Sequence, residues 1–212
     1  HNPRVADVTA AQWREVVALV RERNLVAFID MAYQGFADGI EPDALALKLF
    51  AASGLQFFVS SSFSKSFSLY GERVGALSIV TAGKDEAARV LSQVKRVIRT
   101  NYSNPPTHGG AIVAAVLSNA ELRKMWEDEL GGMRERIRAM RTGLVEKLKA
   151  RGVAQDFSFV AKQRGMFSYT GLTAAQVERL KTEYGIYAVG TGRICLAALN
   201  SRNLDYVAEA IA

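Results

Sequence analysis

Three short and continuously apolar runs constrain the fold of this chain more than any other feature of its sequence. They are Leu25–Ile29, Leu55–Val59 and Val74–Val80, with helical or serine-rich stretches between them. Apolar runs of this length that do not alternate with polar residues are typical of strands buried on both faces, as in a mainly parallel sheet between helices. The sequence therefore predicts an α/β fold.

Helical patterns surround these runs. Apolar residues spaced by threes and fours predict helices over Asp85–Thr100 and near Ala111–Leu117. Thr9 and Thr173 each follow an apolar residue, and each has a glutamine three residues later in the chain. This pattern predicts that a helix with a capping box begins at each threonine. These helices supply the layers that a parallel sheet needs on its faces.

One long helix is predicted from Ala120 to Ala150, and two glycines interrupt its pattern. Gly131 and Gly132 each cost about 1 kcal/mol relative to alanine, so we expect a bend there, between a domain of residues 1–130 and a smaller α+β domain of residues 131–212. The elements predicted for the smaller domain are strands at Met166–Tyr169 and Arg193–Leu196 and helices at Thr173–Tyr184 and Leu204–Ile211.

The composition is that of a soluble globular protein, with 49% apolar residues, 23% charged residues and only four prolines. No apolar run approaches the roughly 20 residues of a membrane-spanning helix, so no membrane association is expected. The single cysteine, Cys195, excludes an internal disulfide and favours a reducing, cytoplasmic location. With two histidines and one thiol, no metal site is predicted.

A net charge of +6 suits a nucleic-acid surface or a pocket for anionic small molecules. The favoured interpretation is that the arginine and lysine side chains solvate helix faces. No aromatic residues alternate with the basic ones as stacking platforms would. Arg134, Arg136, Arg138 and Arg141 fall on several faces of the long predicted helix rather than in one stripe. A non-catalytic nucleic-acid-binding protein is therefore only a remote alternative, and we expect no nucleic-acid partner.

The segment Ser60–Arg73 carries the densest chemical signal. It follows a buried run directly, where open α/β sheets place their ligand crevices. Lys65, surrounded by small hydroxyl side chains, suits a nucleophilic amine, while the serines and Arg73 suit a phosphate monoester. Pyridoxal phosphate carries both an aldehyde, which the Lys65 amine could bond, and a phosphate, which the serines and Arg73 could bind. The segment therefore predicts a pyridoxal phosphate site. The alternative is a flexible serine-rich loop with a solvated lysine.

Asp30 supplies a second element of such a site. It ends the first apolar run, so its carboxylate requires a partner, and a protonated pyridine nitrogen is a suitable one. Tyr33 could donate its phenol to the oxygen on the cofactor ring. The alternative is that Asp30 caps the next turn of the chain.

Several motifs together resemble the aspartate/aromatic amino acid aminotransferase family, class I of the fold-type I pyridoxal-phosphate enzymes. They occur in the family's order from His1 to the end of the chain. The resemblance implies that the chain is a partial copy of that fold, its C-terminal half, with residues 1–130 in the large cofactor-binding domain. The motifs are Asn2-Pro3, Asp30–Phe36, Ser62–Lys65, Gly71–Gly75, Asn101–Pro106 and Gly165–Gly171.

The resemblance also implies roles around the cofactor. Lys65 is similar to the Schiff-base lysine that later moves a proton at the substrate, and Asp30 to the partner of the pyridine nitrogen. Asn2 and Tyr33 would contact the phenolic oxygen of the ring. The remaining cofactor-binding residues implied are Ser62, Ser64, Arg73 and Phe167.

Two arginines match the family's substrate-binding residues. Arg193 corresponds to the arginine that binds the substrate α-carboxylate, and Arg99 to one that binds a side-chain carboxylate from the neighbouring subunit. The resemblance therefore implies a homodimer with shared active sites. Read without it, Arg193 is a strand-edge surface residue, Arg99 a helix C-terminal charge and Phe167 an ordinary core aromatic.

The expected activity is transamination between an aromatic, and also dicarboxylic, L-amino acid and a 2-oxo acid such as 2-oxoglutarate. An aspartate-specific aminotransferase is the alternative. Arg4-Val5 replace the family's usual Thr-Gly, which weakens the placement of Asn2. The opening at His1 and the end at Ala212 suggest a part of a longer polypeptide. The family's N-terminal half brings further cofactor contacts, so the 212-residue piece alone is expected to be inactive.

Overall fold

A computed structural model describes residues 8–212, which form two compact units that meet in sequence between Leu130 and Gly131. Asn2 and the Arg4-Val5 pair lie outside the described residues. The division into residues 1–130 and 131–212 remains the proposal for the domains.

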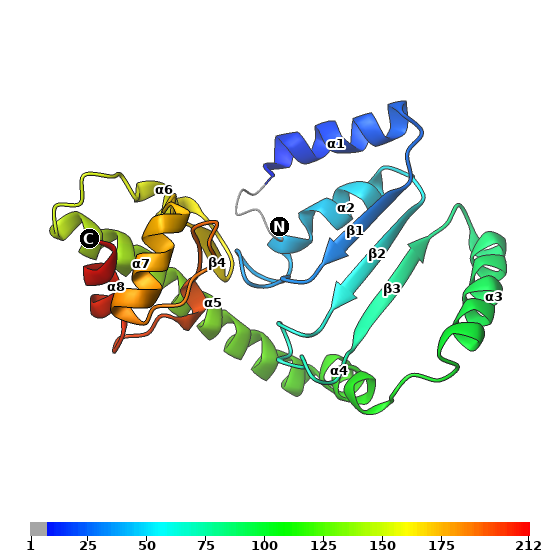
Figure 1. Ribbon diagram of the computed structural model, residues 1–212. Coiled ribbons are helices and arrows are strands. Elements are labelled where there is room, and N and C mark those ends of the chain that lie inside the picture. Colours follow the sequence, from blue (N-terminus) through cyan, green and yellow to red (C-terminus); the bar gives the residue numbers. More distant parts are fainter. Residues whose placement is uncertain (1–7) are drawn as a thin grey trace. The chain divides into compact units, whose positions relative to one another are not determined.

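The first unit contains a three-stranded sheet in the order β1-β2-β3 (Figure 1). β1 (Ala27–Met31) and β2 (Phe57–Ser62) are parallel, and β3 (Gly75–Val80) is antiparallel to β2. The helices of the unit are α1 (Ala10–Glu22), η1 (Pro42–Ala44), α2 (Leu45–Ala52), α3 (Lys84–Asn101), α4 (His108–Ser118) and the first part of α5 (Ala120–Ala150).

The three predicted strands are present, with small shifts of their ends. β1 begins at Ala27, so Leu25 and Val26 precede the strand. The chain passes from β2 to β3 through residues 63–74 without a crossover helix, and this direct return makes the second pair antiparallel. The short helix α2, between β1 and β2, was not predicted from the sequence.

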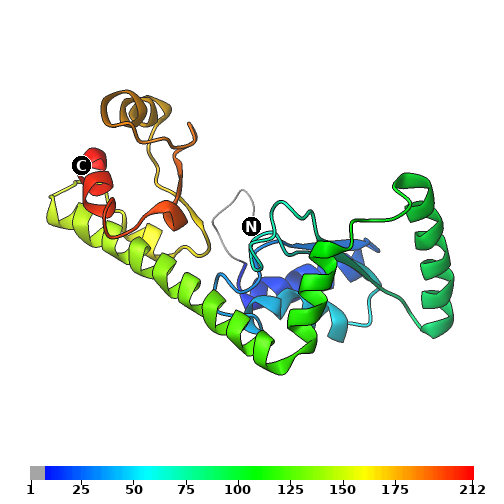
Figure 2. The ribbon, with the colours of Figure 1, turned by 90° about the horizontal axis from the view of Figure 1, so that it is seen from below.

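The core of this unit lies on one face of the sheet. Phe57 and Val59 pack there with Phe50 of α2, and the apolar side of α1 covers the same cluster. On the opposite face, Phe28 is 66% exposed and Leu77 is 56% exposed. Within the described residues, α1 and α2 cover one face of the sheet (Figure 1), and α3 stands beyond β3 (Figure 2).

The helix predictions are largely confirmed. The capping box at Thr9 has both of its hydrogen bonds, and α3 and α4 cover the two predicted helical segments. The long helix α5 has the predicted bounds, Ala120–Ala150, but it continues through Gly131 and Gly132 without a break. The i→i+4 hydrogen bonds on either side of the glycines outweigh their propensity cost.

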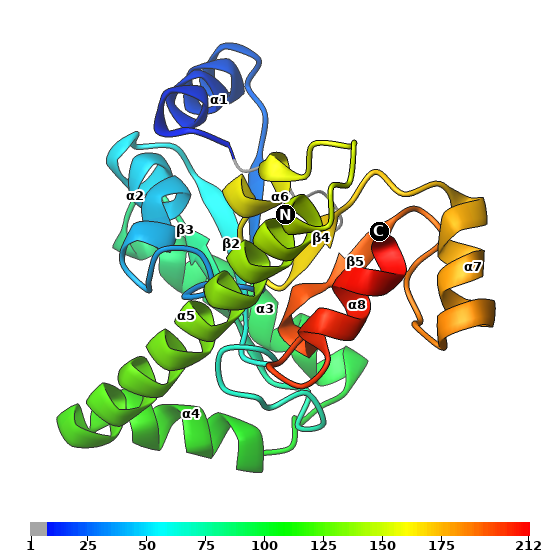
Figure 3. The same cartoon turned by 90° about the vertical axis from the view of Figure 1, so that its left-hand side faces the viewer.

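The second unit contains the rest of α5 and the small elements that follow it. β4 (Phe167–Tyr169) pairs antiparallel with β5 (Arg193–Cys195), and the other elements are α6 (Ser158–Lys162), α7 (Ala174–Tyr184), η2 (Leu196–Ala198) and α8 (Leu204–Ile211) (Figure 3). The predicted capping box at Thr173 is confirmed. Leu172, Val177 and Leu180 form the core under α7.

Candidate active site

The predicted site residues of the first unit gather at one edge of its sheet. Because β1 and β2 are parallel, with Asp30 opposite Ser60 in the register, their carboxyl ends meet at the same edge. Asp30 and Tyr33 leave β1 there, and Lys65 follows the end of β2. β3 runs the other way and starts at this edge, where Gly75 pairs with Ser62. Open α/β sheets bind their ligands at such an edge.

Asp30 lies on the uncovered face of the sheet and is exposed among the described residues. Its Oδ1 accepts a hydrogen bond from Ser60 Oγ at 3.1 Å. Ser60 was not among the predicted site residues, although it opens the serine run. The pair places an acidic and a hydroxyl group side by side on adjacent strands, with the carboxylate open to a cationic partner.

Lys65 is in a turn rather than in a flexible loop. The Phe67 amide donates to the Phe63 carbonyl at 3.3 Å, and the Ser68 amide donates to the Lys65 carbonyl at 3.1 Å. The Lys65 Nζ lies 4.5 Å from the centroid of the Tyr33 ring, and both side chains are half-buried. A cation held over an aromatic face is attracted by the ring. The turn and this contact argue against the solvated-lysine alternative.

The hydroxyls of Ser62 and Ser64 form a small polar cluster beside Lys65. Ser62 Oγ donates to Ser64 Oγ at 3.2 Å, and the Ser64 amide donates to Ser62 Oγ at 3.3 Å. Ser64 is buried, with 7% of its surface exposed. Hydroxyls and backbone amides arranged in this way are suited to phosphate oxygens.

A backbone hydrogen bond next to Arg73 places this residue at the same edge of the sheet. The Phe63 amide donates to the carbonyl of Val74 at 3.2 Å, so the turn after β2 lies against the residue that follows Arg73. The Arg73 Nη1 donates to the Tyr70 carbonyl at 2.9 Å. Its remaining N–H groups leave capacity for an anion.

Close approach and backbone strain mark this segment. A Cβ atom on Gly75 would lie 2.8 Å from the Ser61 carbonyl oxygen, so only glycine lets β3 start so near β2. Ser68 and Arg73 have φ values of 56° and 52°, in the left-handed region that non-glycine residues rarely adopt. Such strain clusters at functional sites.

Arg99 is in the last turn of α3 and is exposed. Its Nη1 donates to Ser103 Oγ, and Ser103 has a left-handed backbone with φ of 65°. This hydrogen bond holds the guanidinium at the helix C-terminus, where the dipole favours a cation. The geometry is compatible with both interpretations of Arg99, as a structural charge or as a substrate-binding group.

In the second unit, Arg193 and Phe167 form a stacked pair. The Arg193 Cζ lies 5.0 Å from the centroid of the Phe167 ring, across the β4–β5 pair. Below them Arg141 of α5 is 3% exposed and donates to the carbonyls of Gly165 at 2.6 Å and Phe167 at 3.3 Å. The general expectation that arginines solvate helix faces therefore does not hold for Arg141.

The other basic residues of α5 in the second unit also make internal contacts. Arg136 donates to the carbonyls of Leu199 at 2.8 Å and Ala197 at 2.9 Å. Arg138 pairs with Glu135 at 3.1 Å. With Arg141 buried, this segment offers few side chains for a phosphate backbone, and the nucleic-acid alternative loses its main support.

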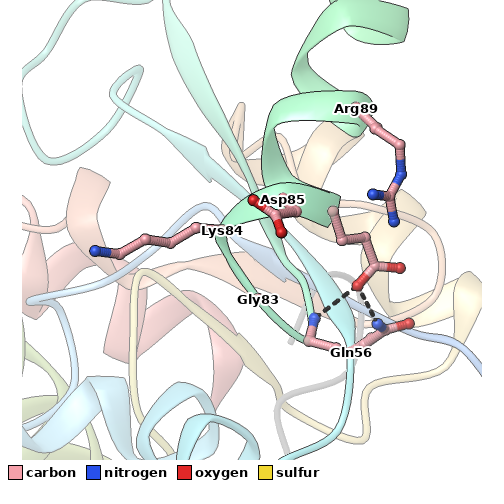
Figure 4. A pocket seen from close by; sticks show the side chains of 7 residues that line it. Gln56, Gly83, Lys84, Asp85 and Arg89 are labelled. Carbon is pink, nitrogen blue, oxygen red and sulfur yellow. Dashed lines mark hydrogen bonds between the residues drawn. The ribbon is translucent and has the colours of Figure 1, made fainter.

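A depression in the first unit lies at the opposite edge of the sheet, before β2 and after β3 (Figure 4). The Glu86 carboxylate there accepts hydrogen bonds from Gln56 Nε2 at 2.7 Å and from the Ala82 amide at 2.8 Å. The start of α3 is therefore already neutralised by its own side chain. This depression contains none of the predicted site residues.

Residues 8–212 contain neither a candidate metal cluster nor a candidate membrane-spanning helix. No three histidine, cysteine, aspartate or glutamate side chains in that range are grouped as a metal site would require. None of its helices has the length and apolar content needed to cross a bilayer.

Sequence reasoning missed two residues besides Ser60 that support the site. Arg141 was missed because a helical arginine is usually exposed. Trp126, which contacts the Lys65 turn, carried a weak signal: it stands four residues before Leu130 on α5, and so on the same side of that helix.

The sheet with a lysine turn at its carboxyl edge, joined in sequence to a small α+β unit, places the chain among the α/β proteins. The chain belongs to the aminotransferase class I and II family, whose model matches residues 1–211. The family expected from the sequence motifs is therefore confirmed.

Similar proteins agree with this assignment. The chain is 66% identical over 211 residues to an aspartate aminotransferase of Pseudomonas aeruginosa and 50% identical over 212 residues to an aromatic-amino-acid aminotransferase of Escherichia coli. Each match covers 100% of this chain and 53% of the relative, so the chain spans about half the length of these curated relatives.

A solved structure gives the same result for the fold. It is an aromatic-amino-acid aminotransferase from Burkholderia pseudomallei, covalently bound to pyridoxal phosphate, with a TM-score of 0.98 and 72% identity. The match covers 100% of this chain and 53% of that one. The predicted fold class is confirmed, and the chain is a partial copy of the fold.

Proposed function

We propose that the full-length protein is a pyridoxal-phosphate-dependent aminotransferase. It would transfer an amino group between an aromatic, and also dicarboxylic, L-amino acid and a 2-oxo acid such as 2-oxoglutarate. The observation that carries the proposal is the Lys65 Nζ, which lies 4.5 Å from the Tyr33 ring centroid at the carboxyl edge of the sheet. Family membership and the pyridoxal phosphate of the Burkholderia pseudomallei relative support the same chemistry.

The donor set at this edge fits pyridoxal phosphate. Lys65 offers a primary amine to the aldehyde carbon, and Asp30 offers a carboxylate to a protonated ring nitrogen. The hydroxyls of Ser62 and Ser64, 3.2 Å apart, suit the phosphate together with Arg73. When bound, the cofactor supplies an electron sink for the bond that breaks at the substrate Cα.

The residues of this chain would divide the remaining work. Lys65 Nζ holds the cofactor before substrate arrives and afterwards moves the proton at the substrate Cα as a general base and acid. Tyr33 supports Lys65 from below and offers its phenol to the ring oxygen. Arg193 binds the substrate α-carboxylate through two parallel N–H donors. The Phe167 ring lies against the Arg193 guanidinium and restricts its orientation.

Substrate preference is the finer part of the proposal. Arg99 would bind the second carboxylate of aspartate or glutamate, while an aromatic side chain would occupy the same region without that ion pair. The names of the similar proteins include both aspartate and aromatic-amino-acid aminotransferases. We favour dual specificity, with an aspartate-specific enzyme as the alternative, and kcat/KM for phenylalanine and aspartate distinguishes them.

The proposed assembly is a homodimer in which Arg99 serves the neighbouring active site. Mixing a Lys65→Ala protein with an Arg99→Leu protein tests this. Shared sites predict recovered aspartate activity, because one of the two sites in each mixed dimer has neither substitution. The free thiol of Cys195 favours a cytoplasmic location.

A visible spectrum of the full-length protein with pyridoxal phosphate tests the cofactor. We expect an absorption band that disappears on borohydride reduction and leaves the label on Lys65. Lys65→Ala should abolish the label, and Lys84→Ala, which removes an exposed lysine of the same unit, should retain it. A label on another lysine would contradict the proposal. The 212-residue chain by itself should not transaminate, because it spans about half of its relatives.

A further inference from the structure

One aromatic side chain of α5 contacts the Lys65 turn in two ways. The Trp126 Nε1 donates to the Ser66 carbonyl at 2.6 Å. The indole also stacks on the Phe67 ring, with centroids 4.4 Å apart and planes inclined by 20°. Phe67 in turn meets the Phe63 ring edge-on at 5.4 Å. Trp126 thus holds both residues that follow Lys65 in the chain.

The same side of α5 fixes the loop that carries Tyr33. Leu130 is one helical turn after Trp126, and a Cβ atom on Gly35 would lie 2.5 Å from its Cδ2. Gly35 has φ of 93°, and its amide donates to Asp43 Oδ2 at 2.8 Å. The backbone beside Tyr33 therefore packs directly against the Leu130 side chain.

Trp126 and Leu130 therefore contact the Lys65 turn and the Tyr33 loop, respectively, from the same helix. Residues four apart on a helix lie on one face, so the spacing is that of a single rigid element. The contact between the two loops that results is the 4.5 Å separation of Lys65 Nζ from the Tyr33 ring centroid.

Space filling alone does not account for Trp126. A cavity of 230 Å³ remains beside the indole, lined also by Phe67, Ser66 and Arg123. An apolar side chain of similar size would fill the same space without a donor. The indole N–H instead reaches a carbonyl of the turn, and a tryptophan with a directed hydrogen bond restricts the turn more than an apolar contact does.

We propose that Trp126 is a positioning residue for Lys65: through Ser66 and Phe67 it holds the ε-amine in the orientation needed to bond to an aldehyde. This inference rests on the proposed function, since it gives Lys65 the role of cofactor-binding amine. Reaction rates depend on holding two groups near their reacting geometry, so a looser turn slows the bond-forming step.

The test uses the full-length protein with Trp126→Phe, which keeps an aromatic ring against Phe67 and removes the donor to Ser66. The first measurement is the rate at which the cofactor-free protein becomes borohydride-fixable at Lys65 after addition of pyridoxal phosphate. We expect it to fall about three- to ten-fold, in proportion to one lost hydrogen bond. The second is the pH midpoint of the bound cofactor's visible absorption, which should shift.

Trp13→Phe is the matched control. Trp13 belongs to the same unit and packs on the core cluster of Phe50, Phe57 and Val59, on the face of the sheet that α1 covers. It should change thermal stability without changing the labelling rate or the absorption midpoint. If Trp126 had only a structural role, Trp126→Phe and Trp13→Phe would have the same labelling rate and the same absorption midpoint.

The outcomes separate the two proposals. Wild-type protein without a label on Lys65 overturns both. A labelled wild type, with Trp126→Phe equal to Trp13→Phe in rate and midpoint, overturns only the positioning role. If Trp126→Phe does not fold, Phe67→Leu replaces it, because this variant removes the stack and should also slow labelling; an unchanged rate there overturns the inference.

Discussion

The guanidinium of Arg193 lies over the ring of Phe167, with its Cζ 5.0 Å from the ring centroid. The antiparallel pairing of β4 with β5 brings the two side chains onto one face, although 26 positions separate them in the chain. The ring restricts the orientations that the guanidinium can adopt. This contact supports the proposal that Arg193 binds a substrate carboxylate.

Phe167→Leu should therefore weaken substrate binding in the full-length protein. A cation–π contact contributes about 0.5–2 kcal/mol, so we expect KM for amino acids to rise about two- to thirty-fold while kcat changes less. Steady-state kinetics with phenylalanine and aspartate measure both. Phe159→Leu, which changes an aromatic residue of α6 in the same unit, is the control, and an equal effect there would contradict the role of Phe167.

Arg99→Leu should separate the two substrate classes. Loss of a charge-assisted hydrogen bond costs about 1.5–3 kcal/mol, so kcat/KM for aspartate should fall at least about ten-fold. The value for phenylalanine should remain nearly unchanged, because its side chain has no carboxylate. Arg96→Leu removes an exposed arginine of the same helix and should affect neither substrate. Equal losses for aspartate and phenylalanine would rule out the side-chain role.

Arg141→Leu should destabilise the protein. The buried guanidinium donates to Ser168 Oγ and to the carbonyls of Val160, Gly165 and Phe167. Leucine would leave these acceptors buried without the donor, at a cost of about 2–3 kcal/mol. Urea unfolding measures the loss. Arg138→Leu, which removes an exposed pair with Glu135, should cost less than about 1 kcal/mol.

Asp205 makes the stability of the second unit depend on pH. The hydrogen bond from Lys147 at 2.6 Å, and then the charges of Lys147 and Arg151, hold the pKa of Asp205 below its ordinary value of 3.8. The folded carboxyl is harder to protonate than the unfolded one. Its contribution to stability is therefore complete above pH 3.8 and declines as the pH falls through the folded pKa.

Asp205→Asn should lower the urea midpoint at neutral pH and leave it unchanged in strong acid, where the wild-type carboxyl is also uncharged. The measurement is a series of urea titrations across that pH range. Glu209→Gln removes another carboxylate from α8 outside this ion pair and should not reproduce the pattern. A difference that persists at low pH would exclude the ion pair as its cause.

Much of the first unit could be predicted from the sequence. The apolar runs identified β1, β2 and β3, and the spacing of apolar residues identified α3, α4 and α5. These signals are local, since strand and helix periodicity depend on neighbouring residues alone. The covered face of the sheet could not be predicted, because a continuous apolar run does not tell which side the helices occupy.

The candidate site also combines residues that local sequence signals predicted with residues that only long-range contacts revealed. Lys65, Asp30, Ser62 and Arg73 were predicted from their residue types and from their position after apolar runs. Ser60, Trp126 and Arg141 were missed, because each acts through a partner that is distant in sequence: Asp30, Ser66 and Gly165, respectively.

The amino-acid sequence alone determined the family, the order of the elements and the residue types that can bind an aldehyde and a phosphate. Only the tertiary structure decided that the Lys65 amine faces the Tyr33 ring and that α5 supports the turn that carries it. The physical reason is that residue chemistry and periodicity are local properties. A contact between distant segments exists only after parallel strands have brought their ends to one edge and a helix has packed against both loops.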